Sequence, residues 1–291
     1  MVTVVAPATS ANLGSGFDVF GVALDRPVDI LSIERAEETT IQLSGYGVDH
    51  IPTTPSNNTA GIVANSLDVS ATIKIDKGIP PASGLGSSAA SAAGAAVGLN
   101  MLYDLGYSAR ELVSIAAQGE AVVAGEPHND NVAPAIMGGF TIASQETIET
   151  IPATMELAIC LPELTTSTKT ARDELPTTIP LEKHSNTIGN AALVTLGMVY
   201  NNSSLVGQGM EETVITPVRA SRIEGYDTVV DMAKNAGAYG VTVSGSGPAV
   251  IAVCSSDNLS SVCSAMVEGF ANHGIESRSF QTSIGSGATV L

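Results

Sequence analysis

With 291 residues, 44% of them hydrophobic but only 4% aromatic, the chain has the length of two ordinary domains and must build its core from aliphatic side chains. Its formal net charge of −17 argues against nucleic acid or an anionic membrane surface as a partner. No apolar run approaches the ~18 residues of a membrane span, and the N-terminus lacks a signal-peptide pattern, so we expect a cytoplasmic protein.

The first segment of the chain is predicted to be mostly β-structure. Strands are expected at 2–5, 19–24 and 28–33, the last two joined by a turn at 25–27. The loop at 7–18 is rich in small residues and carries two polar side chains with reach, Asn12 and Asp18. Both residue types also favour turns, so taken alone they leave a structural role and a binding role open.

A strand at 40–43, a helix at 60–67 and a strand at 71–77 come next. Asn58 or Thr59 is a suitable N-cap for the helix, and the strand alternates apolar with polar residues. Two prolines, Pro80 and Pro81, separate the glycine-rich loop that follows from this strand.

That stretch, PPASGLGSSAAS from residue 80 to 91, leads into an alanine-rich helix that should begin near Ser87 or Ser88 and extend to about residue 102. The first turn of a helix has unpaired N–H groups and attracts anions, and glycines allow the backbone to approach a phosphate closely. We therefore predict a polyphosphate site. The loop lacks the lysine of a P-loop, and its partial G-x-G-x-x-A match is weak, so a plain glycine turn is the structural alternative.

A second long helix is predicted from a capping box, Ser108 with Glu111, to about residue 124. Glu120 lies in an otherwise apolar part of it and is therefore either an exposed residue or a metal ligand. The polar run 128–131 then forms either an ordinary loop or the edge of a site. A strand follows at 140–143, and we place the domain boundary in the connector 144–152.

The second half of the chain is predicted as strand, helices, two paired strands, helix and strand. The strands fall at 155–161, 239–244, 249–254 and 277–283, and the helices at 185–200, 226–235 and 257–272. This order is that of a ferredoxin-like split βαβ unit with an extra helix. The three cysteines have neither disulfide nor metal-site spacing and are expected to be buried.

Three stretches, read together, resemble a known family. They are PATSANLGSGFDVFG from residue 7, the glycine-rich loop from residue 80, and GVTVSGSGPAV from residue 240. In this order they resemble the motifs of the GHMP small-molecule kinases, and with the His-x-Asp-Asn sequence at 128–131 most of all the homoserine kinases. The resemblance runs over the whole chain.

The resemblance implies an α+β fold of two domains, 1–150 and 151–291. The first would be an α/β domain with a left-handed βαβ crossover and the second ferredoxin-like, with ATP in the cleft between them. Adenine contacts would include Asn58, and Ser88 and Glu120 would hold Mg²⁺. The triphosphate would lie on Pro80, Pro81, Ala82, Ser83, Gly84, Leu85, Gly86, Ser87, Ser88, Ala89 and Ala90.

The resemblance also implies transfer of the ATP γ-phosphoryl group to the side-chain hydroxyl of L-homoserine, a step of threonine biosynthesis. Matching positions put Asn12 and Asp18 near the substrate ammonium, and Arg172 and Arg219 on its carboxylate. A guanidinium is suited to a carboxylate and an anion to an ammonium. The remaining expected pocket residues are His128, Thr168, Gly245 and Gly247.

Asp130 and Asn131 are the expected catalytic pair, together with Ser88 and Glu120. Asp130 matches the position of the base of mevalonate kinases, whereas in homoserine kinases the residue matching Asn131 touches the hydroxyl, so the base role stays open. Alternatives are another GHMP kinase of mevalonate, shikimate or sugar type, a dinucleotide-dependent oxidoreductase, and a non-catalytic binding protein. A homodimer is kept as a hypothesis for the assembly, which the sequence alone does not determine.

Overall fold

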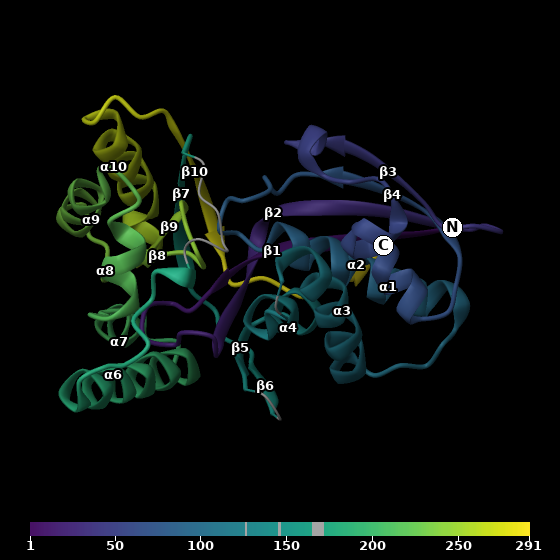
Figure 1. The fold of residues 1–291 in the computed structure, drawn as a ribbon. Helices are drawn as coiled ribbons and strands as arrows, with labels where there is room; N and C mark the ends of the chain where they lie inside the picture. The colour runs from purple at the N-terminus through teal and green to yellow at the C-terminus, as the bar shows by residue number, and fades with distance from the viewer. Residues whose placement is uncertain (126, 145–146, 165–171) are drawn as a thin grey trace.

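The computed structural model describes residues 1–125, 127–144, 147–164 and 172–291. Its strands form two sheets, which occupy opposite halves of the molecule in Figure 1. The larger sheet has seven strands in the order β11-β1-β2-β4-β3, with β5 and β6 added beside β2. These strands are β1 Val2–Ala11, β2 Phe20–Arg35, β3 Thr40–Gly45, β4 Ala71–Lys77, β5 Phe140–Ala143, β6 Ile148–Ile151 and β11 Thr289–Val290.

Helices pack on one face of this sheet because its strands alternate. In β4, for example, Ala71, Ile73 and Ile75 are buried, while Lys74 and Asp76 on the other face are exposed. The small residues of α2 let it approach β1 and β2 closely, and α2 also contacts the neighbouring helices. The four helices are α1 Thr59–Ser66, α2 Ser87–Tyr103, α3 Ala109–Ala124 and α4 Asn129–Met137. Two short 3₁₀ turns, Val48–His50 and Pro55–Asn57, precede α1.

The smaller sheet is antiparallel, in the order β10-β7-β9-β8. Numbered within this half, that is strand order 4-1-3-2, so the predicted ferredoxin-like topology is confirmed. Its strands are β7 Glu156–Pro162, β8 Gly240–Val243, β9 Val250–Cys254 and β10 Ser277–Ser283. Among the described residues of this half, the helices include α6 Leu181–Val199, α7 Ser203–Gly209, α8 Ile215–Ala220, α9 Tyr226–Asn235 and α10 Leu259–Ala271. A 3₁₀ turn, Ser256–Asn258, precedes α10, and all three cysteines are buried as expected.

Two predictions about the first strands were wrong. β1 continues to Ala11 through residues assigned to a loop, and β2 is one strand rather than two strands around a turn. The pairing explains both errors: Pro7 faces Val28 and Thr9 faces Ala23, so β2 bulges there and β1 continues beside it. Pro27 lies in this bulge, where no ladder hydrogen bond is required of it.

Other elements were missed because their signals are weak. The polar run 128–131 opens helix α4, which contains Pro134, and was assigned to a loop before a strand. The short helices α7 and α8 and the short strands β6 and β11 were not predicted.

The strand β11, near the C-terminus, pairs with β1 in the larger sheet. The chain therefore returns to its first half after completing the smaller sheet, and the domain boundary near residue 150 stays a prediction. None of the helices in the described part of the chain has the length and apolar character needed to span a bilayer.

Candidate active site

The glycine-rich loop ends where α2 begins, and glycine itself caps the helix. Gly86 is the N-cap with φ of 64°, and none of the described side chains caps this end. The first N–H groups of a helix have no partner within the helix, so here they are available to an anion. The predicted phosphate site thus has the backbone conformation that it needs.

The middle of the loop is fastened to the third motif and to β1. The Ser244 hydroxyl donates to the Gly84 carbonyl at 2.7 Å, and the Thr9 amide donates to the Leu85 carbonyl at 3.0 Å. At Gly84, φ is +80° and a Cβ would lie 2.4 Å from the Ser244 carbonyl oxygen, so only glycine fits there. The loop is therefore held at the boundary between the two halves of the chain.

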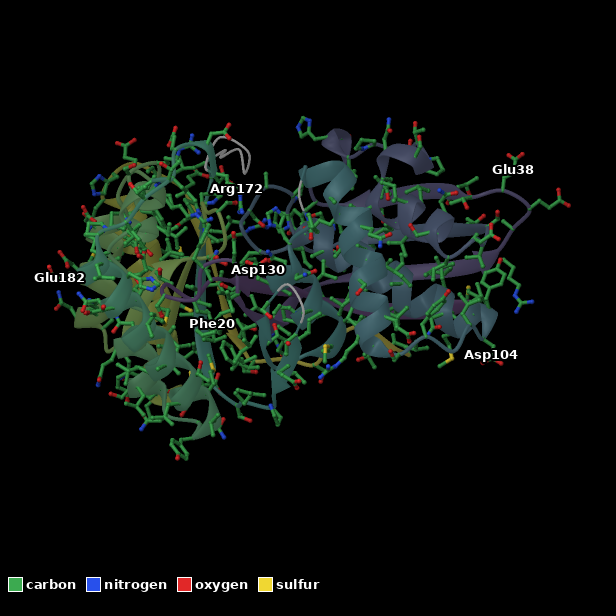
Figure 2. All side chains as sticks on the ribbon, turned by 60° about the horizontal axis from the view of Figure 1, so that its bottom comes forward. Phe20, Glu38, Asp104, Asp130, Arg172 and Glu182 are labelled. Carbon is green, nitrogen blue, oxygen red and sulfur yellow. The ribbon has the colours of Figure 1, made fainter. Side chains whose placement is uncertain are left out.

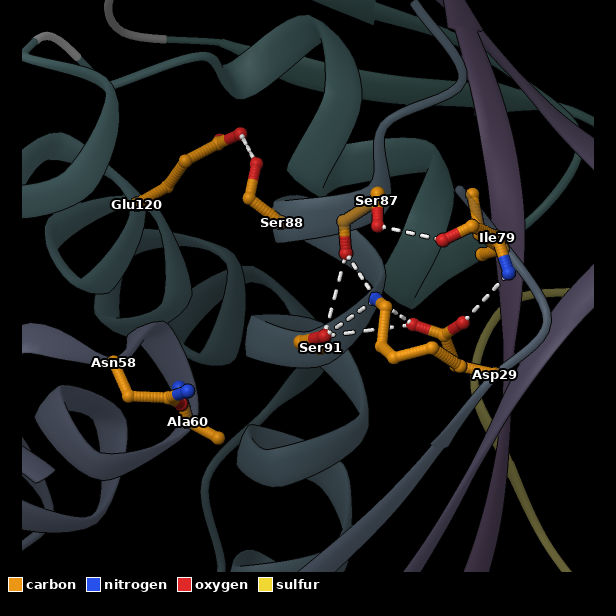
Figure 3. Close-up of polar contacts among 9 residues, drawn as sticks. Asp29, Asn58, Ala60, Ile79, Ser87, Ser88, Ser91 and Glu120 are labelled. Carbon is orange, nitrogen blue, oxygen red and sulfur yellow. Dashed lines mark hydrogen bonds and ion pairs between the residues drawn. The ribbon is translucent and has the colours of Figure 1, made fainter. Parts of the chain in front are cut away.

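Ser88 and Glu120, which come from two neighbouring helices, are in direct contact. The Ser88 hydroxyl donates to Glu120 Oε1 at 2.8 Å (Figure 3). Glu120 is buried, and its Oε2 has no hydrogen-bond partner among the described residues. Burial, with nearby Asp130 adding to it, raises the pKa of the Glu120 carboxyl to about 8.

An orphaned buried carboxylate oxygen beside a hydroxyl fits a hard divalent cation, because Mg²⁺ is commonly held by one or two protein oxygens and completed by phosphates and water. The described residues hold no cluster of three His, Cys, Asp or Glu side chains that would bind a metal without a substrate. The donor set at Ser88 and Glu120 is thus suited to a metal that arrives with a nucleotide.

Asp130 and Asn131 lie in the first turn of α4, beside the loop. The Thr9 hydroxyl donates to Asn131 Oδ1 at 2.9 Å, and a Cβ on Gly86 would lie 3.1 Å from the same atom. Asp130 is buried, and burial with the Asp18 charge raises the pKa of its carboxyl to about 7, although Arg219 and Arg172 oppose that shift. Both predicted residues therefore lie where the loop meets α4.

Three of the predicted substrate-binding residues, Asp18, Arg172 and Arg219, lie around the ring of Phe17 and are called the charged cluster below. Arg172 forms a two-pronged ion pair with Asp18, at 2.7 and 3.2 Å, with its guanidinium carbon 5.7 Å from the centre of the Phe17 ring. Arg219 lies over the same ring at 5.1 Å and is buried, and its Nε has no hydrogen-bond partner among the described residues. The labelled Arg172 and Asp130 lie near the junction of the two halves in Figure 2.

The remaining predicted pocket residues support this cluster in different ways. Asn12 accepts a hydrogen bond from the Asp18 amide at 3.0 Å, and Arg219 donates to the Gly245 carbonyl. Gly247 closes the turn of the third motif by donating to the Ser244 carbonyl at 2.9 Å. His128 is half-buried at the N-cap position of α4.

Asn58 caps α1 by accepting from the Ala60 amide at 3.0 Å, and it donates to the Pro52 carbonyl at 2.8 Å. Its side chain thus has a structural role, and the adenine contact stays a prediction. Thr168 lies outside the described residues.

Sequence reasoning missed Phe17 and Thr9. Phe17 is flanked by the singled-out Asp18, and its ring underlies both arginines. Thr9 was assigned to a loop, yet it bonds both Leu85 and Asn131. The position of Phe17 next to Asp18, an expected substrate ligand, was the one signal in the sequence that could have identified it.

Comparison with known proteins gives matches over the whole chain. The model of the GHMP kinases N terminal domain matches residues 57–139, and that of the GHMP kinases C terminal domain matches 193–272. Homoserine kinases of Haloquadratum walsbyi and Natronomonas pharaonis are each 56% identical over the full length of both chains.

Solved structures agree with these matches. A crystal structure of homoserine kinase from Cytophaga hutchinsonii has a TM-score of 0.91 at 32% identity, covering 100% of this chain and 97% of that one. The L. major mevalonate kinase in complex with R-mevalonate shares the fold at a TM-score of 0.73 and 17% identity, over 97% of this chain and 95% of that one.

Proposed function

Because this chain belongs to the GHMP kinase family, and within it to the homoserine kinases, we propose that the loop and the charged cluster described above are the ATP and amino-acid sites of one active centre. The enzyme transfers the γ-phosphoryl group of ATP to the side-chain hydroxyl of L-homoserine and yields O-phospho-L-homoserine, in threonine biosynthesis. The predicted two-domain kinase fold is the fold of this family.

The observation that carries the site assignment is the charge arrangement around Phe17. A zwitterionic amino acid needs an anion for its ammonium group and a guanidinium for its carboxylate, and Asp18, Arg172 and Arg219 supply both. The unpaired Nε of buried Arg219 is a donor that a substrate carboxylate would satisfy. A mevalonate-type substrate has no ammonium, so it would leave Asp18 without its substrate partner.

The loop and α4 would position the reacting groups. The triphosphate lies on the loop and the first turn of α2, where N–H groups that are already in place stabilise its charge. The substrate hydroxyl lies beside Asn131, its oxygen bonds to the γ-phosphorus, and the bond from that phosphorus to ADP breaks. The hydroxyl proton leaves toward Asp130 or solvent.

Ser88 and Glu120 would hold a magnesium ion, whose charge would neutralise that of the β- and γ-phosphates. The support is the buried, unpartnered Oε2 of Glu120 next to the Ser88 hydroxyl. The cytoplasmic location and the homodimer also remain proposals, the second of which light scattering on the purified protein would decide.

A coupled assay of ADP release tests the proposed function. We expect Mg²⁺-dependent turnover with L-homoserine, and little turnover with serine or threonine at equal concentration. Mevalonate, shikimate and galactose in the same assay distinguish the other family activities, and protection against thermal unfolding by NAD rather than ATP would indicate the oxidoreductase. Turnover with one of these acceptors but not with homoserine would contradict the proposal.

A further inference from the structure

A buried ion pair lies under the glycine-rich loop 80–90, called the phosphate loop from here on. Neither residue of the pair belongs to the groups assigned above. Lys77 at the end of β4 and Asp29 in β2 have side chains that are 1% and 0% exposed and form an ion pair. The antiparallel register pairs Ile30 with Asp76, and its next position brings Asp29 opposite Lys77. The two side chains are therefore neighbours on adjacent strands, on the helix-covered face of the sheet. Figure 3 shows Asp29 of this pair beside Ile79 and Ser91, with dashed lines for the hydrogen bonds to them.

The pair connects to both ends of the loop. At the loop start, the Ile79 amide donates to Asp29 Oδ1 at 3.0 Å. At the loop end, Lys77 Nζ donates to the Ser87 carbonyl and the Ser91 hydroxyl, each at 2.9 Å. The Ser87 hydroxyl in turn donates to the Ile79 carbonyl at 2.9 Å, which joins the two ends directly.

A buried ion pair is a poor means of stabilising a fold, since apolar residues of similar size often serve as well. The pair instead fixes geometry. Its hydrogen bonds set the distance between the two ends of the loop and hold the first turn of α2 close to the sheet. Small errors in the placement of catalytic groups are costly, so such a support affects ligand binding before it affects folding.

We propose that Lys77 and Asp29 are positioning residues that hold the phosphate loop in its nucleotide-binding geometry, a role that rests on the proposed function of that loop. The loop itself contains no lysine. Lys77 would instead support it from below, by its hydrogen bonds to Ser87 and Ser91 and without contact to the phosphates.

The test is the double variant Lys77→Met with Asp29→Asn. It removes both charges together, so that neither is left buried alone, and the side-chain amide introduced in β2 can still accept from the Ile79 backbone N–H. Tyr103→Phe is the matched control, because the Tyr103 hydroxyl donates to the Ser70 carbonyl and ties the opposite end of α2 to the start of β4. Urea unfolding, calorimetric binding of a non-hydrolysable ATP analogue, and KM for both substrates are measured on each.

We expect the double variant to fold and to bind the ATP analogue at least about tenfold more weakly, which corresponds to about 1.4 kcal/mol. Its KM for homoserine should stay within about twofold of the wild-type value, since the pair does not touch the charged cluster. Tyr103→Phe should lose stability and keep its nucleotide affinity. Wild-type affinity in a folded double variant, or an equal loss in the control, would overturn the inference.

Ser91→Ala is the second variant, to be measured in the same way if the double variant does not fold. This change removes one acceptor of Lys77, and we expect a smaller but measurable loss of nucleotide affinity with unchanged KM for homoserine; unchanged nucleotide affinity would overturn the inference. Failure of the proposed function would differ from all of these results, because the wild-type protein itself would then fail to bind ATP or to phosphorylate homoserine.

Discussion

Arg172 is half-exposed and forms an ion pair with Asp18. We expect Arg172→Ala to raise KM for homoserine by about 10- to 100-fold, since one lost charge-assisted contact accounts for about 1.5–3 kcal/mol. KM for ATP should change little. Arg110→Ala is the control: Arg110 forms an exposed ion pair with Glu149 on the surface, and its loss should leave both KM values unchanged. Equal effects of the two variants would contradict the assignment.

Glu120 makes a prediction about pH. Burial raises the pKa of its carboxyl to about 8, against about 4.5 in the unfolded chain, so the folded protein holds an extra proton between these values. The resulting stability is complete below pH ~4.5 and is lost as the pH rises through about 8. Glu120→Gln carries no charge at any pH. Its unfolding free energy, relative to that of the wild type, should therefore rise across this window by on the order of a few kcal/mol.

Urea unfolding of both proteins at pH 5, 7 and 9 without metal measures this difference. A difference that stays constant with pH would contradict the raised pKa. The same variant should lose Mg²⁺-dependent protection by ATP against thermal unfolding, which a purely structural carboxyl would not control.

Asp130 is buried and its carboxyl has a pKa raised to about 7, so its ionised fraction grows as the pH passes 7. Transfer through a loose transition state needs little help from a base, and we expect Asp130→Asn to lower kcat by less than about tenfold. A true general base contributes ~10²–10⁴-fold. Asp130 would be the base if kcat fell by that much in the variant. In that case the wild-type kcat should also rise between pH 6 and 8, while the kcat of the variant stays constant over the same pH range.

Among the elements, the phosphate loop is where a single methyl group should matter most. Gly84→Ala must place a Cβ 2.4 Å from the Ser244 carbonyl oxygen at a φ of +80°, so the loop has to move away from the third motif. We expect a loss of ATP affinity of at least about tenfold. Gly106→Ala is matched for backbone strain, with a φ of +75° and nothing within 4 Å of the added Cβ. It should cost about 1 kcal/mol of stability and leave ATP affinity unchanged. Equal ATP binding by the two variants would argue against the loop.

Elements with strong local signals were predicted well. The capping box of α3 and the alternation of β4 are written into neighbouring residues, and both elements were found. β1 and β2 were divided wrongly because their length depends on pairing across the bulge at Pro7 and Thr9. α4 was missed because its first turn is polar and it contains Pro134.

The residues of the candidate site likewise fall into those that a local sequence pattern identifies and those that depend on long-range pairing. Gly84 and Gly86 were identified from their own stretch of sequence, whereas Lys77 and Asp29 were not, because their contact depends on the register of two strands and joins residues 48 positions apart. Asp18, Arg172 and Arg219 entered through the family resemblance, and no local pattern would have brought them together.

For the molecule as a whole, the acidic charge balance bears on where the cationic side chains lie. The chain has 12 Lys and Arg residues in all, against 29 Asp and Glu, so a site for anions must gather the few cations available. Arg172 and Arg219 stand over the ring of Phe17, at the junction of the two halves, whereas Lys77 is paired with Asp29 beneath the neighbouring loop. Both halves of the chain therefore contribute residues to the proposed centre.

A crystal structure with a non-hydrolysable ATP analogue, Mg²⁺ and L-homoserine tests this centre most directly. We expect the triphosphate on the 80–90 loop and the metal between Ser88 and Glu120. The amino-acid carboxylate should lie on Arg172 and Arg219, with its ammonium at Asp18. A nucleotide bound elsewhere, or homoserine bound away from both arginines, would contradict it.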